Sequence, residues 1–300
     1  MEMLDTPVMP RNQGQGLADG LNLQDYVCQN LNMFSGKVKT MRDLYIRSMR
    51  LIEPLPRESW LNDLPVVRQL AESGINFHKQ VTFFVGENGS GKSTLIEALA
   101  VSQGFNPEGG TRNFNFHTAD THSELCDYLR VARGVIHPRD GFFLRAESFY
   151  NVASNIDELD EGAPGDYSST DRIIDSYGHV SLHRQSHGES FLATVENRFG
   201  GYGLYILDEP EAALSPGGII RLIRNMERLV RMDSQFIIST HSPMLIAFPG
   251  AEVYQIEEDG LVSVHYRQTN HYRTTVRFLQ NPESAIEDIL GEEYAANDDV

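Results

Sequence analysis

One nine-residue stretch limits the folds open to this chain more than any other. Residues 86–94 read Gly-Glu-Asn-Gly-Ser-Gly-Lys-Ser-Thr, which fits the spacing G-x-x-x-x-G-K-[ST] of a phosphate-binding loop. The apolar run Gln80 to Val85 precedes the loop, and Ser93 to Val101 follows it with apolar residues at helical spacing. A strand, a glycine-rich loop and a helix in this order predict a P-loop fold of the α/β class.

The residue types in this loop indicate its chemistry. Glycines let backbone N–H groups turn toward a β-phosphate at the start of a helix. The ammonium group of Lys92 reaches the β- and γ-phosphates, and the hydroxyl of Ser93 is placed for Mg²⁺. We therefore predict that the loop binds ATP together with Mg²⁺. The predicted nucleotide-binding residues are Gly86, Glu87, Asn88, Gly89, Ser90, Gly91, Lys92, Ser93 and Thr94.

Strands and helices alternate along the rest of the chain. This alternation predicts a mainly parallel central sheet that is covered by helices on both faces. The segment Ser123 to Arg133 reads as a helix, and Gly218 to Val230 reads as an amphipathic helix. The predicted strands are Tyr45 to Ile52, Gly141 to Arg145, Gly203 to Leu207 and Gln235 to Ser239, with a hairpin formed by Glu252 to Glu257 and Leu261 to Tyr266.

Two of these strands end in polar residues. Asp208 and Glu209 follow one strand, and Thr240 and His241 follow the other. Because parallel strands end at a common edge where ligands bind, these side chains are expected near the phosphate loop. Asp208 would belong to the magnesium shell, Glu209 would polarise the attacking water, and His241 would face the γ-phosphate. A single histidine at a strand end also fits a structural role.

A third motif precedes these strands. Ser186-His187-Gly188-Glu189-Ser190 opens a predicted helix from Phe191 to Arg198. A hydroxyl, a glycine and a helix N-terminus suit contact with a γ-phosphate. The same pattern fits a plain helix N-cap by Ser186 or Ser190. We expect Ser186, Gly188 and Glu189 to contact nucleotide.

In this order, the motifs resemble those of the ATP-binding-cassette (ABC) superfamily, over roughly Tyr45 to Tyr266. The phosphate loop would be Walker A, Ser186 to Glu189 the signature, Leu204 to Glu209 Walker B, Ala212 to Pro216 the D-loop and His241 the switch histidine. The resemblance implies an ABC-type antiparallel β subdomain and a small helical signature subdomain at about residues 147–200. It also implies ATP hydrolysis, with Glu209, Lys92 and His241 catalytic, in a head-to-tail homodimer that holds ATP between its subunits.

A narrower resemblance connects the chain to small bacterial ATPases described as "AAA family ATPase". Four strings carry it, residues 143–148, 186–191, 207–216 and 235–243. Relatives of that group include recombination and chromosome-maintenance ATPases, but no substrate follows from the likeness.

Two departures from the superfamily pattern stand out. Glu147 occupies about the place of the Q-loop glutamine, which makes it a candidate magnesium ligand. The signature reads Ser-His-Gly-Glu instead of the transporters' Ser-Gly-Gly-Gln, and Glu211 replaces a usual small residue. The changes at the signature and at Glu211 point away from transporters. The complete motif set, without a membrane or coiled-coil module, favours an ATP-driven conformational switch that acts on an unknown protein partner. An ATPase component of a DNA-repair or anti-phage defence system is the alternative, and a nucleotide-binding subunit of a transporter fits less well.

Composition narrows the range of partners. The formal net charge is −17, which disfavours binding to nucleic acid because such binding depends on basic side chains. No apolar run is long enough to span a membrane, so we expect a cytoplasmic protein. We further expect a flexible leader at residues 1–40, one ATPase domain at 41–282 and an acidic tail at 283–300. His179, His183 and His187 recur every fourth residue, but the alternation of Val180 and Leu182 argues against a helical metal site.

Overall fold

The computed structural model describes residues 44–112, 123–149, 152, 154, 177 and 186–297, with side chains described through residue 290. The expected leader at residues 1–40 and most of the expected signature subdomain at 147–200 lie outside these ranges.

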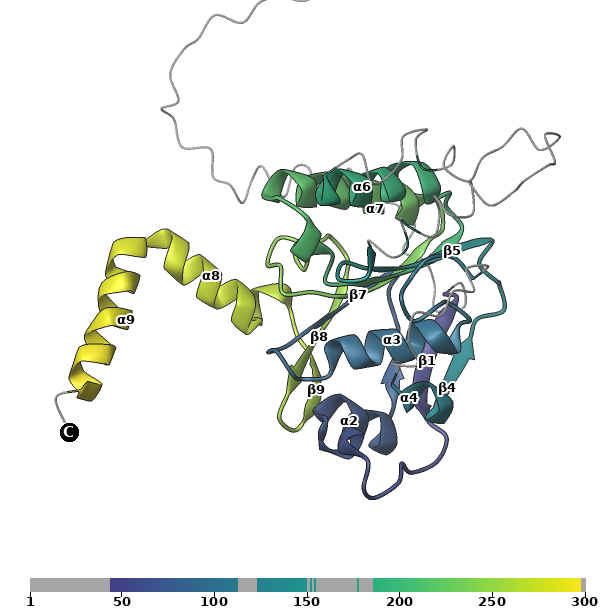
Figure 1. Ribbon diagram of the computed structural model, residues 1–300, viewed down its shortest axis with the longest axis horizontal. Helices are drawn as coiled ribbons and strands as arrows, with labels where there is room; N and C mark the ends of the chain where they lie inside the picture. Colours follow the sequence, from purple (N-terminus) through teal and green to yellow (C-terminus); the bar gives the residue numbers. More distant parts are fainter. Residues whose placement is uncertain are drawn as a thin grey trace, which may run out of the picture. The chain divides into compact units, whose positions relative to one another are not determined.

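A six-stranded sheet forms the centre of the fold, in the order β5-β6-β7-β3-β8-β9 (Figure 1). All neighbouring strands run parallel except β8 and β9, which form an antiparallel hairpin. The predicted α/β class and mainly parallel sheet are therefore confirmed. The strands are β3 (Val81–Val85), β5 (Asp140–Arg145), β6 (Gly203–Asp208), β7 (Gln235–Ser239), β8 (Glu252–Glu257) and β9 (Gly260–Ser263).

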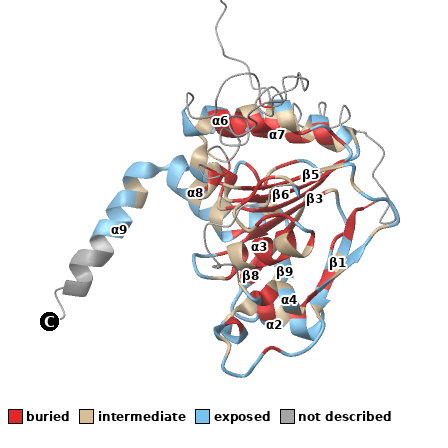
Figure 2. Cartoon of the chain, turned by 45° about the vertical axis from the view of Figure 1, so that its right-hand side comes forward, coloured by how far each residue is buried: buried red, intermediate tan, exposed pale blue. Residues whose placement is uncertain are grey.

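Both faces of this sheet are buried. Along β6, Tyr205 and Leu207 belong to one apolar cluster, whereas Leu204 and Ile206 belong to a second. Because successive residues of a strand point to opposite faces, an uninterrupted apolar run requires helices on both sides. The first cluster is completed by α6 (His187–Ala193) and α7 (Pro216–Arg231), and the second by α2 (Pro65–Glu72) and α3 (Lys92–Ser102) (Figures 1 and 2).

A separate antiparallel sheet has the order β2-β1-β4, and it confirms the expected antiparallel β subdomain. Its strands are β1 (Ile46–Leu51), β2 (Ile75–Asn76) and β4 (Leu129–Arg133). The expected helix over Ser123 to Arg133 is wrong for most of its length. Helix α4 (Leu125–Tyr128) makes a single turn, and the chain then extends into β4 because that segment pairs with β1 from Leu51–Leu129 to Ile46–Arg133.

The chain after the β8–β9 hairpin is more ordered than the sequence indicates. The second predicted hairpin strand ends early, at Ser263, and a short 3₁₀ turn follows at Tyr266–Gln268. Helix α8 (Asn270–Gln280) was not predicted, and α9 (Pro282–Asn297) contains most of the acidic tail. The side chains of both helices are mostly exposed through residue 290 (Figure 2). Within the described residues, no helix is long and apolar enough to cross a membrane.

Candidate active site

The strand register brings the candidate residues to one edge of the sheet. Arg145 on β5 lies opposite Asp208 on β6, and Asp208 lies opposite Ser239 on β7. Ser239 in turn pairs with Phe84 on β3, two residues before the phosphate loop begins. Parallel pairing thus brings four distant stretches of sequence together at the carboxyl ends of the strands. In open α/β sheets, ligands bind at this edge.

The backbone of the phosphate loop depends on glycine. Gly91 caps α3 with φ +93°, and Gly89 has φ +79°, a region that L side chains rarely adopt. At Gly91 an added Cβ would lie 2.7 Å from Cγ1 of Val66 on α2, so close packing excludes a side chain as well. The tight turn therefore follows from the sequence, and it points the first N–H groups of α3 out of the helix, as an anion site requires.

Lys92 is buried at the start of α3. Its ammonium group donates to the carbonyl oxygens of Gly86 at 2.9 Å and Glu87 at 3.1 Å, both in the loop itself. Burial lowers the pKa of Lys92, while the nearby carboxylates of Glu209 and Asp208 oppose that shift. The charge is therefore held inside the loop by backbone oxygens and balanced by acidic side chains.

The loop also contains a buried polar atom that lacks a hydrogen-bond partner, the hydroxyl oxygen of Ser90. A buried hydroxyl without a partner is costly unless a ligand satisfies it. Together with the open backbone donors and Lys92, this atom makes the loop fit a phosphate chain.

Asp208 and Ser93 supply oxygen donors beside the loop. Asp208 is almost fully buried, and it accepts hydrogen bonds from the hydroxyls of Ser239 and Ser93. Burial raises the pKa of Asp208, and these two hydroxyls and Arg145 limit the shift. A carboxylate and a hydroxyl are hard oxygen ligands of the kind Mg²⁺ prefers. Ser93 and Asp208 are therefore the residues that would hold a magnesium ion beside the loop.

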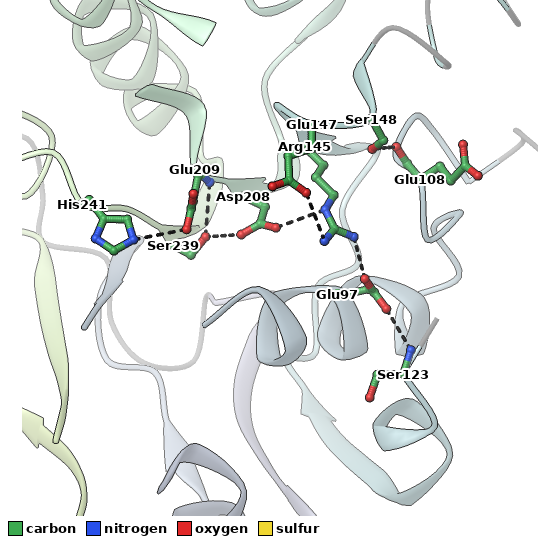
Figure 3. A network of polar contacts seen from close by, with 10 residues as sticks. All are labelled: Glu97, Glu108, Ser123, Arg145, Glu147, Ser148, Asp208, Glu209, Ser239 and His241. Atoms are coloured by element: carbon green, nitrogen blue, oxygen red, sulfur yellow. Dashed lines mark hydrogen bonds and ion pairs between the residues drawn. The ribbon is translucent and has the colours of Figure 1, made fainter. Parts of the chain in front are cut away.

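Arg145 is the centre of an ion-pair network next to Asp208 (Figure 3). Its guanidinium lies 2.6 Å from Glu97 Oε2 on α3, 3.4 Å from Asp208 Oδ2 and 3.8 Å from Glu147 Oε2. The side chain of Glu147 is 81% exposed and forms its ion pair with Arg145. At the position where the sequence suggested Glu147 as a metal ligand, Arg145 is thus the residue that contacts the Walker B carboxylate.

Glu209 and His241 lie side by side at the ends of β6 and β7 (Figure 3). Glu209 adopts a left-handed backbone conformation, φ 47° and ψ 53°, and its N–H donates to the Ser239 carbonyl. Oε1 of Glu209 is 3.3 Å from Nε2 of His241. The strained backbone, rare for a residue other than glycine, directs the carboxylate toward the histidine.

Glu211 holds the loop that carries His241. It accepts hydrogen bonds from the His241 N–H and from the Thr240 hydroxyl. Burial raises the pKa of Glu211, and its Oε2 atom is buried without a hydrogen-bond partner. Glu211, which departs from the superfamily pattern, therefore fixes the backbone at His241.

The signature residues make contacts of a different kind. Ser186 caps α6 in a capping box with Glu189, whose carboxylate is 3.1 Å from the Ser186 N–H. These hydrogen bonds lower the pKa of Glu189. An added Cβ on Gly188 would lie 2.7 Å from the Ala213 carbonyl oxygen, so glycine permits α6 to approach the D-loop. Ser186 and Glu189 remain exposed, and a second molecule has access to them.

Sequence reasoning missed several residues of this site. Arg145 stands at a predicted strand end, so the rule that identified Asp208 should also have selected it. Glu97 lies on the buried side of a predicted helix, where a carboxylate is itself a signal. His271 on α8 gave no signal, because no element was predicted there. It lies 2.9 Å from His241. Of the three evenly spaced histidines, His187 is described, and its ring contacts the Ala146 carbonyl and Phe149.

Comparisons with known proteins find similar sequences. A family model described as "AAA domain" matches residues 67–138, which include the phosphate loop. A curated protein of Haemophilus influenzae, an uncharacterized ABC transporter ATP-binding protein, is 26% identical over 195 residues, which cover 60% of this chain and 70% of that protein.

Two solved structures are also similar to the chain. One is cbiO1 of Clostridium perfringens, part of the ABC transporter complex cbiONQ, with 16% identity and a TM-score of 0.45 over 83% of this chain and 99% of that one. The other is the SMC head domain of Thermotoga maritima, with 16% identity and a TM-score of 0.37 over 74% of this chain and 99% of that one.

Proposed function

We propose that this chain is an ATPase of the ABC type that binds and hydrolyses ATP with magnesium between two copies of itself, and the family-model match and the curated relative support this. One observation carries the proposal: Asp208 and Glu209 at the end of β6, His241 after β7 and Lys92 at the start of α3 lie at one edge of the sheet. No two of these residues would by themselves indicate ATP hydrolysis. The four together supply the groups that phosphoryl transfer needs to bind phosphate, hold magnesium and orient water.

Each residue has a defined role in this proposal. Lys92 and the N–H groups at the start of α3 bind the β- and γ-phosphates. Ser93 and Asp208 hold Mg²⁺, which when bound neutralises charge on the phosphate oxygens. Glu209 orients the attacking water and accepts its proton, because its carboxylate is partly exposed beside His241. His241 donates from Nε2 to the γ-phosphate and keeps the Glu209 carboxylate in its position.

The second copy of the chain completes the site. Ser186, Gly188 and Glu189 are at the exposed start of α6, and in the proposed dimer they face the γ-phosphate of the nucleotide bound by the partner subunit. Helix N-termini favour anions, so the start of α6 supplies a favourable dipole. Glu147, which we proposed as a further magnesium ligand, lies beside this site on the chain that binds the nucleotide.

Turnover of Glu209→Gln tests the mechanism directly. The wild-type chain should hydrolyse ATP only with Mg²⁺, and the variant should lose turnover by about a hundredfold or more, the range expected for a general base. Because the variant still binds nucleotide, it should accumulate an ATP-bound dimer in size-exclusion chromatography. Lys92→Ala is the matched control, since it should lose both turnover and the dimer. Full activity in Glu209→Gln would refute this mechanism.

The work performed by hydrolysis is proposed to be a conformational switch on a protein partner. Pull-down with Glu209→Gln in ATP, compared with Lys92→Ala, should recover that partner only with the first variant. DNA-stimulated turnover would instead favour a role in DNA repair or defence. Because the relative from Haemophilus influenzae is called an ABC transporter ATP-binding protein, co-purification with an integral membrane protein is the outcome that would favour a transporter subunit.

A further inference from the structure

A second histidine contacts the switch histidine. Nε2 of His271, in the first turn of α8, lies 2.9 Å from Nδ1 of His241. The two rings are tilted by 60° with centroids 5.0 Å apart, so the contact is a hydrogen bond between ring nitrogens and not a stack. His241 is thus hydrogen-bonded to His271 at Nδ1, while its Nε2 lies 3.3 Å from Glu209 and makes no hydrogen bond to the described residues.

The start of α8 is anchored firmly enough to position a side chain. Thr269 caps the helix by accepting from the Tyr272 N–H. The Asn270 N–H donates to Oε1 of Gln255 on β8, at 3.0 Å, and Thr269 is fully buried. His271 is therefore fixed to the central sheet and does not depend on the exposed remainder of α8.

The charges around the pair favour a neutral His271. Burial lowers the pKa of His271, and the neighbouring His241 lowers it further. Among the other groups that act on it, Lys92 also lowers the pKa, while Glu87 opposes the shift. One shared proton then lies between Nε2 of His271 and Nδ1 of His241.

The position of Glu209 decides which histidine donates. If His241 donated from Nδ1, its bare Nε2 would face the Glu209 carboxylate at 3.3 Å, and two acceptors would oppose each other. If His271 donates from Nε2, His241 carries its proton on Nε2. In that form His241 can donate to Glu209 or to a phosphate oxygen. The first arrangement places two acceptors 3.3 Å apart, whereas the second places an N–H group beside the carboxylate and leaves it available to a phosphate oxygen.

We propose that His271 is a positioning residue that holds His241 in the Nε2–H tautomer needed to donate to the γ-phosphate. The inference rests on the proposed ATPase function. It deepens that function by assigning α8, which follows the hairpin at the end of the ATPase fold, to the nucleotide site. A ring nitrogen fixed by a hydrogen bond at the other ring nitrogen is a general way to set a histidine tautomer.

Two variants and a control separate positioning from packing. His271→Phe fills the space but removes the nitrogen, and His271→Gln places an amide N–H near the position of Nε2. We expect kcat to fall about tenfold or more in His271→Phe, within the range seen for residues that orient a catalytic group. The KM for ATP should change less than about twofold, and His271→Gln should recover most of kcat. Arg273→Gln, at an exposed position two residues on, should match the wild type.

Nitrogen-15 NMR of the histidine rings tests the tautomer without relying on activity. In the wild-type chain, His241 should be protonated at Nε2, and in folded His271→Phe its tautomers should become mixed. A wild-type His241 protonated at Nδ1 would overturn the inference even if His271→Phe failed to fold. Equal kcat in His271→Phe and wild type would overturn it as well. Absence of hydrolysis in the wild type would refute the proposed function, whereas the NMR result would still decide the tautomer.

Discussion

Replacing Arg145 by methionine should destabilise the protein because it leaves two carboxylates without their cation. Methionine keeps an unbranched apolar stem but removes the guanidinium that lies 2.6 Å from Glu97 and 3.4 Å from Asp208. The side chains of Glu97 and Asp208 are only 11% and 4% exposed. Water therefore cannot replace the lost partner, and the desolvation cost of both groups remains.

The size of the loss in the free energy of unfolding follows from how far these side chains are buried. Removing one partner of a fully buried pair costs about 3–5 kcal/mol. Arg145 itself is 24% exposed, so part of the Coulomb attraction is already screened. Its contact with the exposed Glu147 adds little, since surface pairs contribute about 0–1 kcal/mol. We expect a loss of about 2–4 kcal/mol in the free energy of unfolding, which for a domain of this size lowers Tm by roughly 5–15 °C.

The loss should also depend on pH. Burial raises the pKa of Asp208, and Arg145 is one of the groups that oppose this shift, so the variant raises that pKa further. A carboxyl with a raised folded-state pKa destabilises the protein as pH rises from the unfolded value through the folded value. The difference between wild type and Arg145→Met should therefore be larger at pH 8 than at pH 5.

Urea denaturation at the two pH values, without nucleotide, measures this difference. Arg224→Met, at an exposed site on α7, is the matched control and should cost less than about 0.5 kcal/mol. A double-mutant cycle with Glu97→Gln should give a coupling of about 1 kcal/mol or more. The network has no energetic role if Arg145→Met costs no more than Arg224→Met, and the desolvation argument is wrong if the cost is equal at both pH values.

Three further predictions concern stability without nucleotide. Burial alone would raise the pKa of Asp140, but a guanidinium, a backbone N–H and a phenol hydroxyl hold it below its usual range. Asp140→Asn should therefore cost about 1–3 kcal/mol at pH 7, and urea titrations should show this cost shrinking as pH falls toward 3. Gly91→Ala should lower Tm more than Gly250→Ala, because both glycines have positive φ but only Gly91 would clash with Val66. Asp208→Asn should raise the stability of the nucleotide-free chain by about 1 kcal/mol at pH 7 but not below about pH 4, and a thermal melt that shows a loss at pH 7 would contradict the raised pKa.

The sequence predicted the central sheet well because each strand carries its own signal. β3, β6 and β7 are short apolar runs that end at glycine or polar residues, and a parallel sheet buried on both faces needs that composition. The phosphate loop was equally plain, since its spacing and both flanking elements are local features of the chain. Such signals do not require knowledge of which strands become neighbours.

The errors arose where pairing decides the conformation. The segment Leu129 to Arg133 has no strong preference of its own, and it is a strand because β1 offers it a partner. Helix α8 was not predicted, because four of its first six residues are positively charged or carry a hydroxyl group. In the structure, the buried N-cap residue Thr269 fixes the start of this helix. Arg145, Glu97 and Asp208 were not recognised as one network, because they are distant in sequence. The strand register joins Arg145 to Asp208, and the packing of α3 brings Glu97 to them.

Several residues at this edge of the sheet have backbone conformations or buried polar groups that are unfavourable in the chain alone. Glu209 has a left-handed backbone, Asp208 and Glu211 are buried carboxyls with raised pKa, and the hydroxyl of Ser90 is buried without a partner. Each of these costs stability in the chain alone. A cation, a phosphate or a proton donor would stabilise the buried carboxyls and the Ser90 hydroxyl. Departures from local rules gather at functional sites in natural proteins. Their convergence on the phosphate loop supports an ATP site more strongly than any one motif does, because a structural loop would have no need to retain all of them.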